Sequence, residues 1–179
     1  MIVELRQYTL RPGTRDDFAR LFDEAFVASQ EEVGITVVGQ LHDRDDPDRY
    51  VWLRAFPDMV ARRASLEAFY VAPCPAWRRH KQEANASILD NDDVLLLRPV
   101  AGWVPPSAPV GTPDVTITVW PGTIGLAGPH LVSVDEVNDF PALPVRDEQV
   151  TVAIGPHPPV AVTPLQVLHL SPTPSSALR

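Results

Sequence analysis

The stretch Ile2-Val3-Glu4-Leu5-Arg6-Gln7-Tyr8-Thr9-Leu10, which the turn Arg11-Pro12-Gly13 follows, decides the fold class that the sequence predicts. Side chains alternate between the two faces of a strand, so Val3 and Leu5 share one face while Glu4, Arg6 and Tyr8 share the other. The apolar face suits contact with a layer of helices. If the strand is central in a sheet, both faces are covered, and the polar row must then sit in a wet or paired cavity.

Composition limits the classes of protein to which the chain can belong. Its 179 residues suffice for one or two compact domains. The net charge of −8 argues against a nucleic-acid partner. The single cysteine, Cys74, excludes an internal disulfide and fits a cytoplasmic location. The N-terminus has the pattern of a strand rather than of a signal peptide, and no apolar run approaches the roughly 20 residues that span a bilayer, so we expect no membrane partner.

Residues 1–99 have the pattern of one ferredoxin-like unit. Phe18, Leu21, Phe22, Ala25 and Phe26 recur at helical spacing after the first turn, and this helix is expected to start at Thr14 and stop at Gly34. The remaining elements are two strands at 36–42 and 50–56, helices at 58–70 and 76–89, and a strand at 93–98. The order is therefore β-α-β-β-α-β.

The rest of the chain predicts a second, reduced unit. Residues 100–114 are rich in proline and are expected to form a linker. Residues 115–179 hold four extended runs, at 115–120, 131–134, 149–154 and 165–170, and the segments between them are too short or too rich in proline and glycine for helices. We interpret this half as a weak internal repeat that has lost both crossover helices and is mostly β.

Alternation along these later strands predicts which face meets the core. The Val and Ile face should close the core with the first half, and the face of Thr116, Thr118 and Thr151 should be open to water. Trp120 would then be exposed and would suit a contact between two copies of the chain.

Many spaced positions resemble the NIPSNAP family in order. They are Glu4-x-Arg6-x-Tyr8 with Pro12-Gly13, Trp52-x-Arg54-x-Phe56, Phe69-Tyr70, Trp77, His80, Glu83-Ala84-Asn85, and Asp90-x-Asp92 before Val94-Leu95-Leu96-Leu97-Arg98-Pro99. Two later stretches resemble the second repeat of bacterial members: Asn138-x-Phe140-Pro141-x-Leu143-Pro144-Val145-Arg146 and Leu170-Ser171-Pro172-Thr173-x-Ser175.

The resemblance implies an α+β fold in which two ferredoxin-like repeats form a barrel, usually paired as a homodimer. The wider group of dimeric α/β barrels also holds cofactor-free monooxygenases, dehydratases and haem-handling proteins, and the family has no single agreed reaction. The sequence departs from the family where the second repeat should contain helices.

Candidate site residues fall on the polar strand faces, which in such a barrel we expect to line its interior. Glu4 or His42 would be the catalytic base, and Arg6 with Arg54 would hold a developing anion. The expected substrate-binding residues are Tyr8, Gln40, Trp52, Phe56, Trp77 and His80. The alternatives are that Glu4 forms a buried ion pair with Arg6 or Arg54 that only stabilises the barrel, and that His42 is a solvated histidine at the rim.

The predicted function is that of a small-molecule enzyme in specialised biosynthesis that works without a tightly bound cofactor. The reaction would be proton transfer, cyclisation, dehydration or oxygenation of an acidic or conjugated substrate. A non-catalytic binding or interaction protein on the same barrel is the first alternative. A haem-binding protein with His42 or His80 as axial ligand is the second. The five histidines lack metal-ligand spacing, so no metal is expected.

Overall fold

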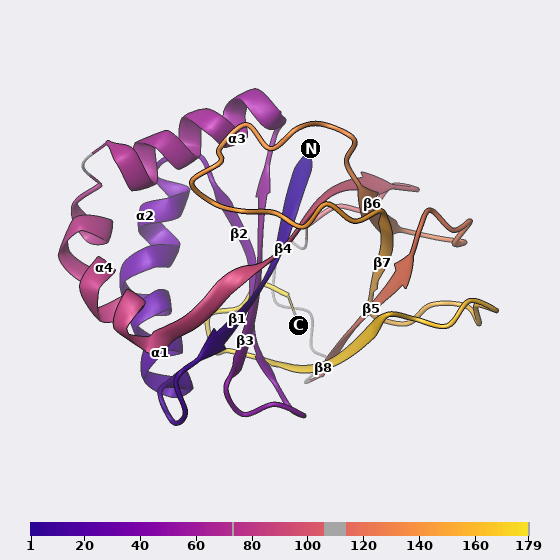
Figure 1. Ribbon diagram of the computed structural model, residues 1–179, viewed down its shortest axis with the longest axis horizontal. Helices are drawn as coiled ribbons and strands as arrows, with labels where there is room; N and C mark the ends of the chain where they lie inside the picture. The colour runs from indigo at the N-terminus through magenta and orange to yellow at the C-terminus, as the bar shows by residue number, and fades with distance from the viewer. Residues whose placement is uncertain (73, 106–113, 179) are drawn as a thin grey trace.

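The computed structural model describes residues 1–72, 74–105 and 114–178. Within these residues, eight strands close an antiparallel barrel, and three helical segments cover one side of it (Figure 1). The strands are β1 (Ile2–Leu10), β2 (Thr36–Asp43), β3 (Arg49–Phe56), β4 (Ile88–Val100), β5 (Val115–Pro121), β6 (His130–Ser133), β7 (Val150–Ile154) and β8 (Gln166–Pro172). Their order around the barrel is β1-β3-β2-β8-β5-β7-β6-β4, which confirms the α+β class and the barrel.

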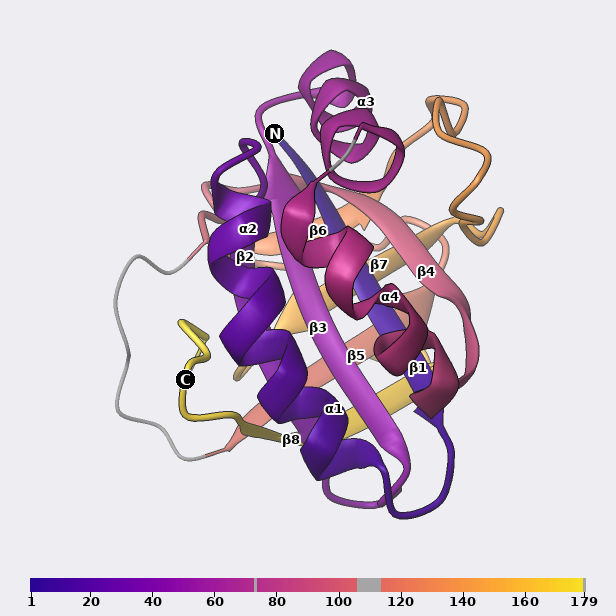
Figure 2. The same cartoon turned by 90° about the vertical axis from the view of Figure 1, so that its left-hand side faces the viewer.

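The helical layer comes entirely from the first half of the described chain. The first segment joins α1 (Arg15–Leu21), the π-helical turn η1 (Phe22–Phe26) and α2 (Val27–Glu31); the second joins α3 (Met59–Leu66) and the π-helical turn η2 (Glu67–Val71); the third is α4 (Pro75–Ser87). The Asp58 carboxylate caps α3 by accepting a 2.8 Å bond from the Ala61 amide, and Pro75 begins α4 at a position where proline is tolerated. These segments lie over β1, β3 and their neighbours (Figure 2).

The barrel interior is an apolar core to which every strand contributes. Val3 and Leu5 of β1 and Val51, Leu53 and Ala55 of β3 pack there with residues of the other six strands and with Trp103. A barrel of eight strands encloses just enough room for side chains to fill it. The expectation that the polar row lines the interior is therefore wrong, because Tyr8, Trp52 and Phe56 pack in a second core against the helices. The apolar face of β1 and β3 thus points into the barrel and the polar face points toward the helices, the reverse of the prediction.

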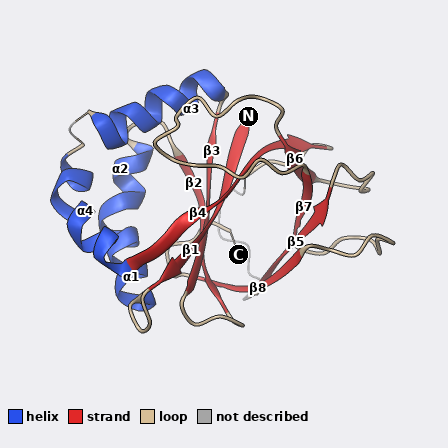
Figure 3. Cartoon of the chain, viewed as in Figure 1, coloured by secondary structure: helices blue, strands red, loops and turns tan. Residues whose placement is uncertain are grey.

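The second half carries no helix among its described residues, and loops cover its outer face instead (Figure 3). Trp120 is only 1% exposed, with its ring centroid 4.6 Å from that of His157. Thr118 and Thr151 are also buried, and the Thr151 hydroxyl accepts a 3.0 Å bond from the Ile124 amide. The expectation of an open face is wrong for Thr118, Thr151 and Trp120, since the loops around 121–129 and 155–165 pack on them, while Thr116 is partly exposed. The predicted closure of the core by the Val and Ile face is confirmed.

The predicted linker at 100–114 begins as part of the barrel. Strand β4 runs to Val100, a turn at Ala101-Gly102 follows, and Trp103 packs into the interior core. Residues 106–113 of the predicted linker lie outside the described residues. Among the described helices, none is long and apolar enough to cross a membrane.

Candidate functional site

The predicted site residues of β1, β2 and β3 share the side of the sheet that faces the helices. Register explains the placement, because Glu4 lies opposite Arg54, Arg6 opposite Trp52, and Gln40 opposite Trp52 on the other edge of β3. These residues are at most 6% exposed, together with Tyr8 and Phe56, so they are packed rather than arranged around one open cavity. They separate into a closed charge cluster around Glu4 and a pocket beside His42.

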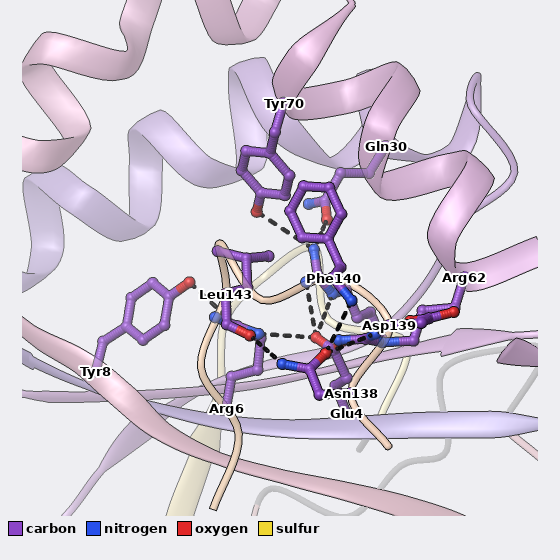
Figure 4. Close-up of polar contacts among 11 residues, drawn as sticks. Glu4, Arg6, Tyr8, Gln30, Arg62, Tyr70, Asn138, Asp139, Phe140 and Leu143 are labelled. Carbon is purple, nitrogen blue, oxygen red and sulfur yellow. Dashed lines mark hydrogen bonds and ion pairs between the residues drawn. The ribbon is translucent and has the colours of Figure 1, made fainter. Parts of the chain in front are cut away.

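The charge cluster has one carboxylate at its centre (Figure 4). Glu4 Oε2 accepts from Arg6 Nη1 at 2.8 Å and from Arg54 Nε at 2.7 Å. Glu4 Oε1 accepts from Arg62 Nε of α3 at 2.7 Å. All four side chains are fully buried. Both carboxylate oxygens are thus held by charged donors that come from two strands and one helix, so the cluster ties the sheet to α3.

The electrostatics of the cluster keep Glu4 ionised. Burial alone would raise the pKa of the Glu4 carboxyl, but the charges of Arg54, Arg6 and Arg62 and the hydrogen bond from Arg62 outweigh it. The pKa of Glu4 is therefore held far below its ordinary value. A buried carboxylate of this kind is a poor proton acceptor at neutral pH, so the arrangement favours the ion-pair alternative for Glu4 over a role as catalytic base.

Aromatic rings surround the guanidinium groups of the cluster. The Arg54 guanidinium lies 5.1 Å from the Trp52 ring centroid and 5.5 Å from that of Phe56. The Arg6 guanidinium lies 5.6 Å from both Tyr8 and Trp52. Cation–π contacts stabilise charges that are removed from water, so Tyr8, Trp52 and Phe56 act here as the packing around the arginines.

The segment between β6 and β7, residues 134–149, contacts the cluster at Arg62. Arg62 Nη1 donates to Asp139 Oδ1 at 2.6 Å and to Asn138 Oδ1 at 3.1 Å. Phe140 is buried beside Tyr70, with the two ring centroids 6.4 Å apart. This β6–β7 segment, from the second half of the chain, completes a site whose other residues all belong to the first half.

The His42 pocket lies between α1, β2 and the C-terminal segment, with a volume of about 330 Å³. Its lining residues are Asp16, Ala19, Arg20, Asp23, Glu24, His42, Thr173, Pro174 and Ser175. Burial lowers the pKa of His42, and the nearby Arg15 charge lowers it further, so the neutral ring is favoured. Burial raises the pKa of Asp23, although the hydroxyls of Ser175 and Thr173 oppose that shift.

Among the described residues, unpaired buried polar atoms occur at His42 and at two residues next to this pocket, Gln40 and Tyr50. Within the described chain, His42 Nε2, Gln40 Oε1 and the Tyr50 hydroxyl are buried and have no hydrogen-bond partner. His42 lies opposite Tyr50 in the β2–β3 register, and Gln40 Nε2 reaches Asp23 Oδ1 at 3.4 Å. Buried polar groups are normally paired, so this concentration marks a place suited to a polar ligand or to ordered water.

The C-terminal wall of the pocket depends on Gly39. The Thr173 amide donates to Gln40 O at 2.9 Å, and the Gln40 amide donates to Ser176 Oγ at 3.2 Å. A side chain at Gly39 would put its Cβ 2.7 Å from Leu178 Cβ. Only glycine therefore allows the C-terminal segment to approach β2 closely enough to form this wall.

The two remaining predicted binding residues lie in the helical layer, away from the strand residues. The Trp77 ring packs against Phe26, Phe69 and Tyr70. His80 is on α4, where its Nδ1 lies 3.5 Å from Glu83 Oε2. None of these contacts involves Glu4 or His42.

Four residues were not predicted from sequence: Arg62 and Asp139 of the charge cluster, and Asp23 and Tyr50 in or next to the His42 pocket. Arg62 could have been found, because it shares the buried stripe of its helix with Leu66 and Phe69 at a spacing of four and then three residues. A charged residue on such a stripe needs a buried partner. Asp23 and Asp139 gave no comparable signal, since their partners are distant in sequence.

Among the described residues, no group of three or more His, Cys, Asp or Glu side chains is placed to hold a metal ion. An axial haem ligand has to present a free ring nitrogen; Nε2 of His42 has no partner among the described residues, but it is buried, and the pocket that His42 lines holds only about 330 Å³.

Two solved structures of the NIPSNAP type are similar to part of this chain. A NIPSNAP-like domain protein from Burkholderia xenovorans is 26% identical, with a TM-score of 0.50, and covers 63% of this chain and 95% of its own. A NIPSNAP family protein from Agrobacterium tumefaciens str. C58 is 19% identical, with a TM-score of 0.51, and covers 56% of this chain and 94% of its own. Each covers between half and two thirds of this chain.

One solved structure matches nearly the whole fold. It comes from Lactobacillus acidophilus NCFM, carries a provisional description as a monooxygenase, and covers 96% of this chain and 93% of its own. Its TM-score is 0.58 at 10% identity, which shows a shared fold alone. A search of curated proteins gave no match. The NIPSNAP family model matches residues 3–102, more than half of the sequence, and the chain therefore belongs to the NIPSNAP family.

Proposed function

We propose that this protein binds a small organic molecule in the His42 pocket and transfers a proton there, without a tightly bound cofactor. The observation that carries the proposal is His42 itself. It lines a pocket of about 330 Å³, and its buried Nε2 has no partner among the described residues. A general base needs a free lone pair near the substrate, and no group of the described residues occupies this nitrogen.

The environment of His42 suits the role of base. Its pKa is lowered by burial and by Arg15, so the ring is neutral and able to accept a proton near pH 7. The Asp16 carboxylate acts in the opposite direction and would stabilise the imidazolium that forms. Glu4, the other predicted base, is engaged with three arginines and would not compete for the proton.

The charges around the pocket favour a neutral or cationic substrate. Asp16, Asp23 and Glu24 line it together with a single arginine, Arg20, whose Nη2 already lies 2.6 Å from Asp17. The acidic substrate that was expected from Arg6 and Arg54 would need those arginines, which are buried elsewhere on this face. Proton transfer, or a cyclisation or dehydration that begins with it, fits the groups present better than haem chemistry does.

The test is solvent deuterium incorporation into small neutral ketones such as dihydroxyacetone, followed by proton NMR in D2O. Exchange of a C–H next to a carbonyl needs only a base. We expect the protein to accelerate this exchange, and His42→Gln to lose about 10²- to 10⁴-fold of the acceleration. The matched control is His169→Gln, because His169 is exposed and pairs with Asp45 at 2.7 Å outside the pocket.

Two results would count against the proposal. One is that no ketone of the panel exchanges faster than in buffer. The other is that His42→Gln is as active as the wild-type protein. Ketone binding without exchange would instead support the alternative of a non-catalytic binding protein that uses the same pocket.

We also propose that residues 115–179 are a second ferredoxin-like unit reduced to its strands. The supporting observation is strand order, because β8-β5-β7-β6 repeats the arrangement β4-β1-β3-β2. The second unit closes the barrel within one chain, which removes one reason for pairing with another copy. The homodimer implied by the family resemblance stays a prediction, and light scattering across a concentration series tests it.

A further inference from the structure

The charge cluster around Glu4 holds more positive than negative charge. Arg6, Arg54 and Arg62 are fully buried, and Glu4 is the buried carboxylate that they share. The second negative group is Asp139, which is 24% exposed and reaches only Arg62. Buried charges are normally neutralised by partners, so the excess of positive charge favours any anion that competes for these arginines, including one that replaces Asp139.

Unused donors show where that anion would sit. Arg62 uses Nε for Glu4 and shares Nη1 between Asp139 and Asn138. Its Nη2 is buried and has no partner within the described chain. A guanidinium binds a carboxylate best through two parallel N–H···O bonds. The outer edge of the Arg62 guanidinium consists of Nη1 and Nη2. Asp139 binds Nη1 and leaves Nη2 without an acceptor among the described residues.

We propose that an organic carboxylate binds the outer edge of Arg62 through Nη1 and Nη2 and takes the place that Asp139 now holds. Asp139 is then an internal stand-in for the ligand, and the β6–β7 segment is displaced when the ligand binds. This site is separate from the His42 pocket and does not depend on the proton transfer proposed there.

The part of the segment that would move has hydrogen bonds of its own, and Phe140 is its buried contact with the core. Within it, Asn138 Nδ2 donates to Leu143 O at 2.8 Å, and the Leu143 amide donates to Phe140 O at 3.1 Å. The anchors lie at its ends, where the Val134 amide bonds Leu96 O at 3.0 Å and the Arg146 amide bonds Val94 O at 2.8 Å. Residues 138–143 can therefore lift as a unit while both ends stay attached to β4.

A hollow already lies along this segment. Its volume is about 400 Å³, and its lining includes Asn138, Val134 and Arg146. Asn138, which lines the hollow, also accepts from Arg62, so the hollow and the proposed anion position share this residue. The Phe140 ring packs beside Tyr70, with the two centroids 6.4 Å apart, so lifting the segment uncovers the Tyr70 ring. An uncovered ring beside the arginines favours a carboxylate with a flat aromatic body over a small aliphatic acid.

The hollow has an acidic rim, which provides a control for the general effect of negative charge on anion binding. Asp135, Glu136, Asp147 and Glu148 all line it. These groups repel an approaching anion but lie on the exposed surface, where salt screens them. A variant that removes one rim carboxylate therefore measures the general effect of charge, apart from the specific competition by Asp139.

The experiment is calorimetric titration of benzoate into the wild-type protein, Asp139→Asn and the control Asp147→Asn. Both variants remove one negative charge from the same segment. We expect Asp139→Asn to bind benzoate at least tenfold more tightly than the wild type, and Asp147→Asn to change the affinity less than twofold. Equal affinities for the two variants, or no benzoate binding by either, would overturn the proposal.

A measurement on the wild-type protein keeps the proposal falsifiable if Asp139→Asn folds poorly. Saturating benzoate should speed backbone hydrogen exchange within 138–143 and leave α1 unchanged. Binding of benzoate with no change in exchange of this segment would mean that the carboxylate does not displace Asp139, and the proposal would fail. Loss of ketone exchange at His42 has no bearing on either result, so the two proposals can fail separately.

Discussion

The charge cluster around Glu4 and the His42 pocket lie on the same face of the same sheet, yet they differ in how their polar groups are paired. Both oxygens of Glu4 are bonded to arginines, and Asp139 of the β6–β7 segment pairs with Arg62, although Nη2 of Arg6 and of Arg62 has no partner within the described chain. At His42, buried Nε2, Gln40 Oε1 and the Tyr50 hydroxyl have no partner among the described residues. The titratable group at the centre of the first region, Glu4, is bonded at both oxygens, whereas Nε2 of His42 stays free to accept a proton. We therefore expect the first region to contribute mainly to stability and the second to carry the proposed proton transfer.

The largest effect should come from Glu4→Ala. It would strand three buried guanidinium groups, and breaking such a buried network costs about 3–5 kcal/mol in the free energy of unfolding. Arg6→Ala should cost less, because Glu4 keeps its bonds to Arg54 and Arg62. Denaturant unfolding curves of the two variants and of the wild type measure both values. If Glu4→Ala lowers the free energy of unfolding by less than about 1 kcal/mol, as is typical of an exposed ion pair, the Glu4 cluster is not the stabilising region that we describe.

A smaller effect is expected from Gly39→Ala, which acts on the wall of the pocket. The new Cβ would lie 2.7 Å from Leu178 Cβ, so the C-terminal segment must shift. Overpacking of this kind costs about 1–3 kcal/mol. Gly125→Ala is the matched control, since its added Cβ meets nothing within 4 Å. Unfolding curves that coincide for the two variants would show that the C-terminal segment does not need this close approach.

The smallest effect is a pH dependence that separates the two regions. The pKa of His42 is lowered in the folded state, so the fold prefers the neutral ring. Its contribution to stability is complete above the unfolded pKa of about 6.5 and is lost as the pH falls toward the folded value. The pKa of Glu4 is also lowered, and its contribution is lost only in much stronger acid.

The readout is the free energy of unfolding at pH 7.5 and pH 5.5. The free energy of unfolding should fall less from pH 7.5 to pH 5.5 in His42→Gln than in the wild type. In His169→Gln it should fall as much as in the wild type. An unchanged slope in His42→Gln would mean that His42 is not desolvated as the structure has it.

Much of the first half could be predicted from sequence because its signals are local. Helical spacing after Thr14 and alternation in β1 and β3 identified the elements, and the spaced family positions identified the NIPSNAP domain. Alternation shows which residues share a face but not which way that face points. Here both faces are covered, and closure of the barrel by the second half decides that the apolar face turns inward.

The site was less predictable because its contacts join distant parts of the chain. Glu4 meets Arg62 across 58 residues, and Arg62 meets Asp139 across a further 77. The covered outer face of β5 and β7 was missed for a related reason. Loops rich in proline and glycine lack a periodic pattern, so nothing in residues 121–129 indicated that Leu126 would pack beside Trp120.

The division between the two regions is tested most directly by one measurement, the rate of ketone deuterium exchange per folded molecule in Glu4→Gln and in His42→Gln. Folded protein is quantified by circular dichroism in the same samples. The account predicts that His42→Gln loses the acceleration while Glu4→Gln, although less stable, retains it. Loss of exchange in folded Glu4→Gln together with full activity in His42→Gln would contradict it, and would place the chemistry at the arginine cluster instead.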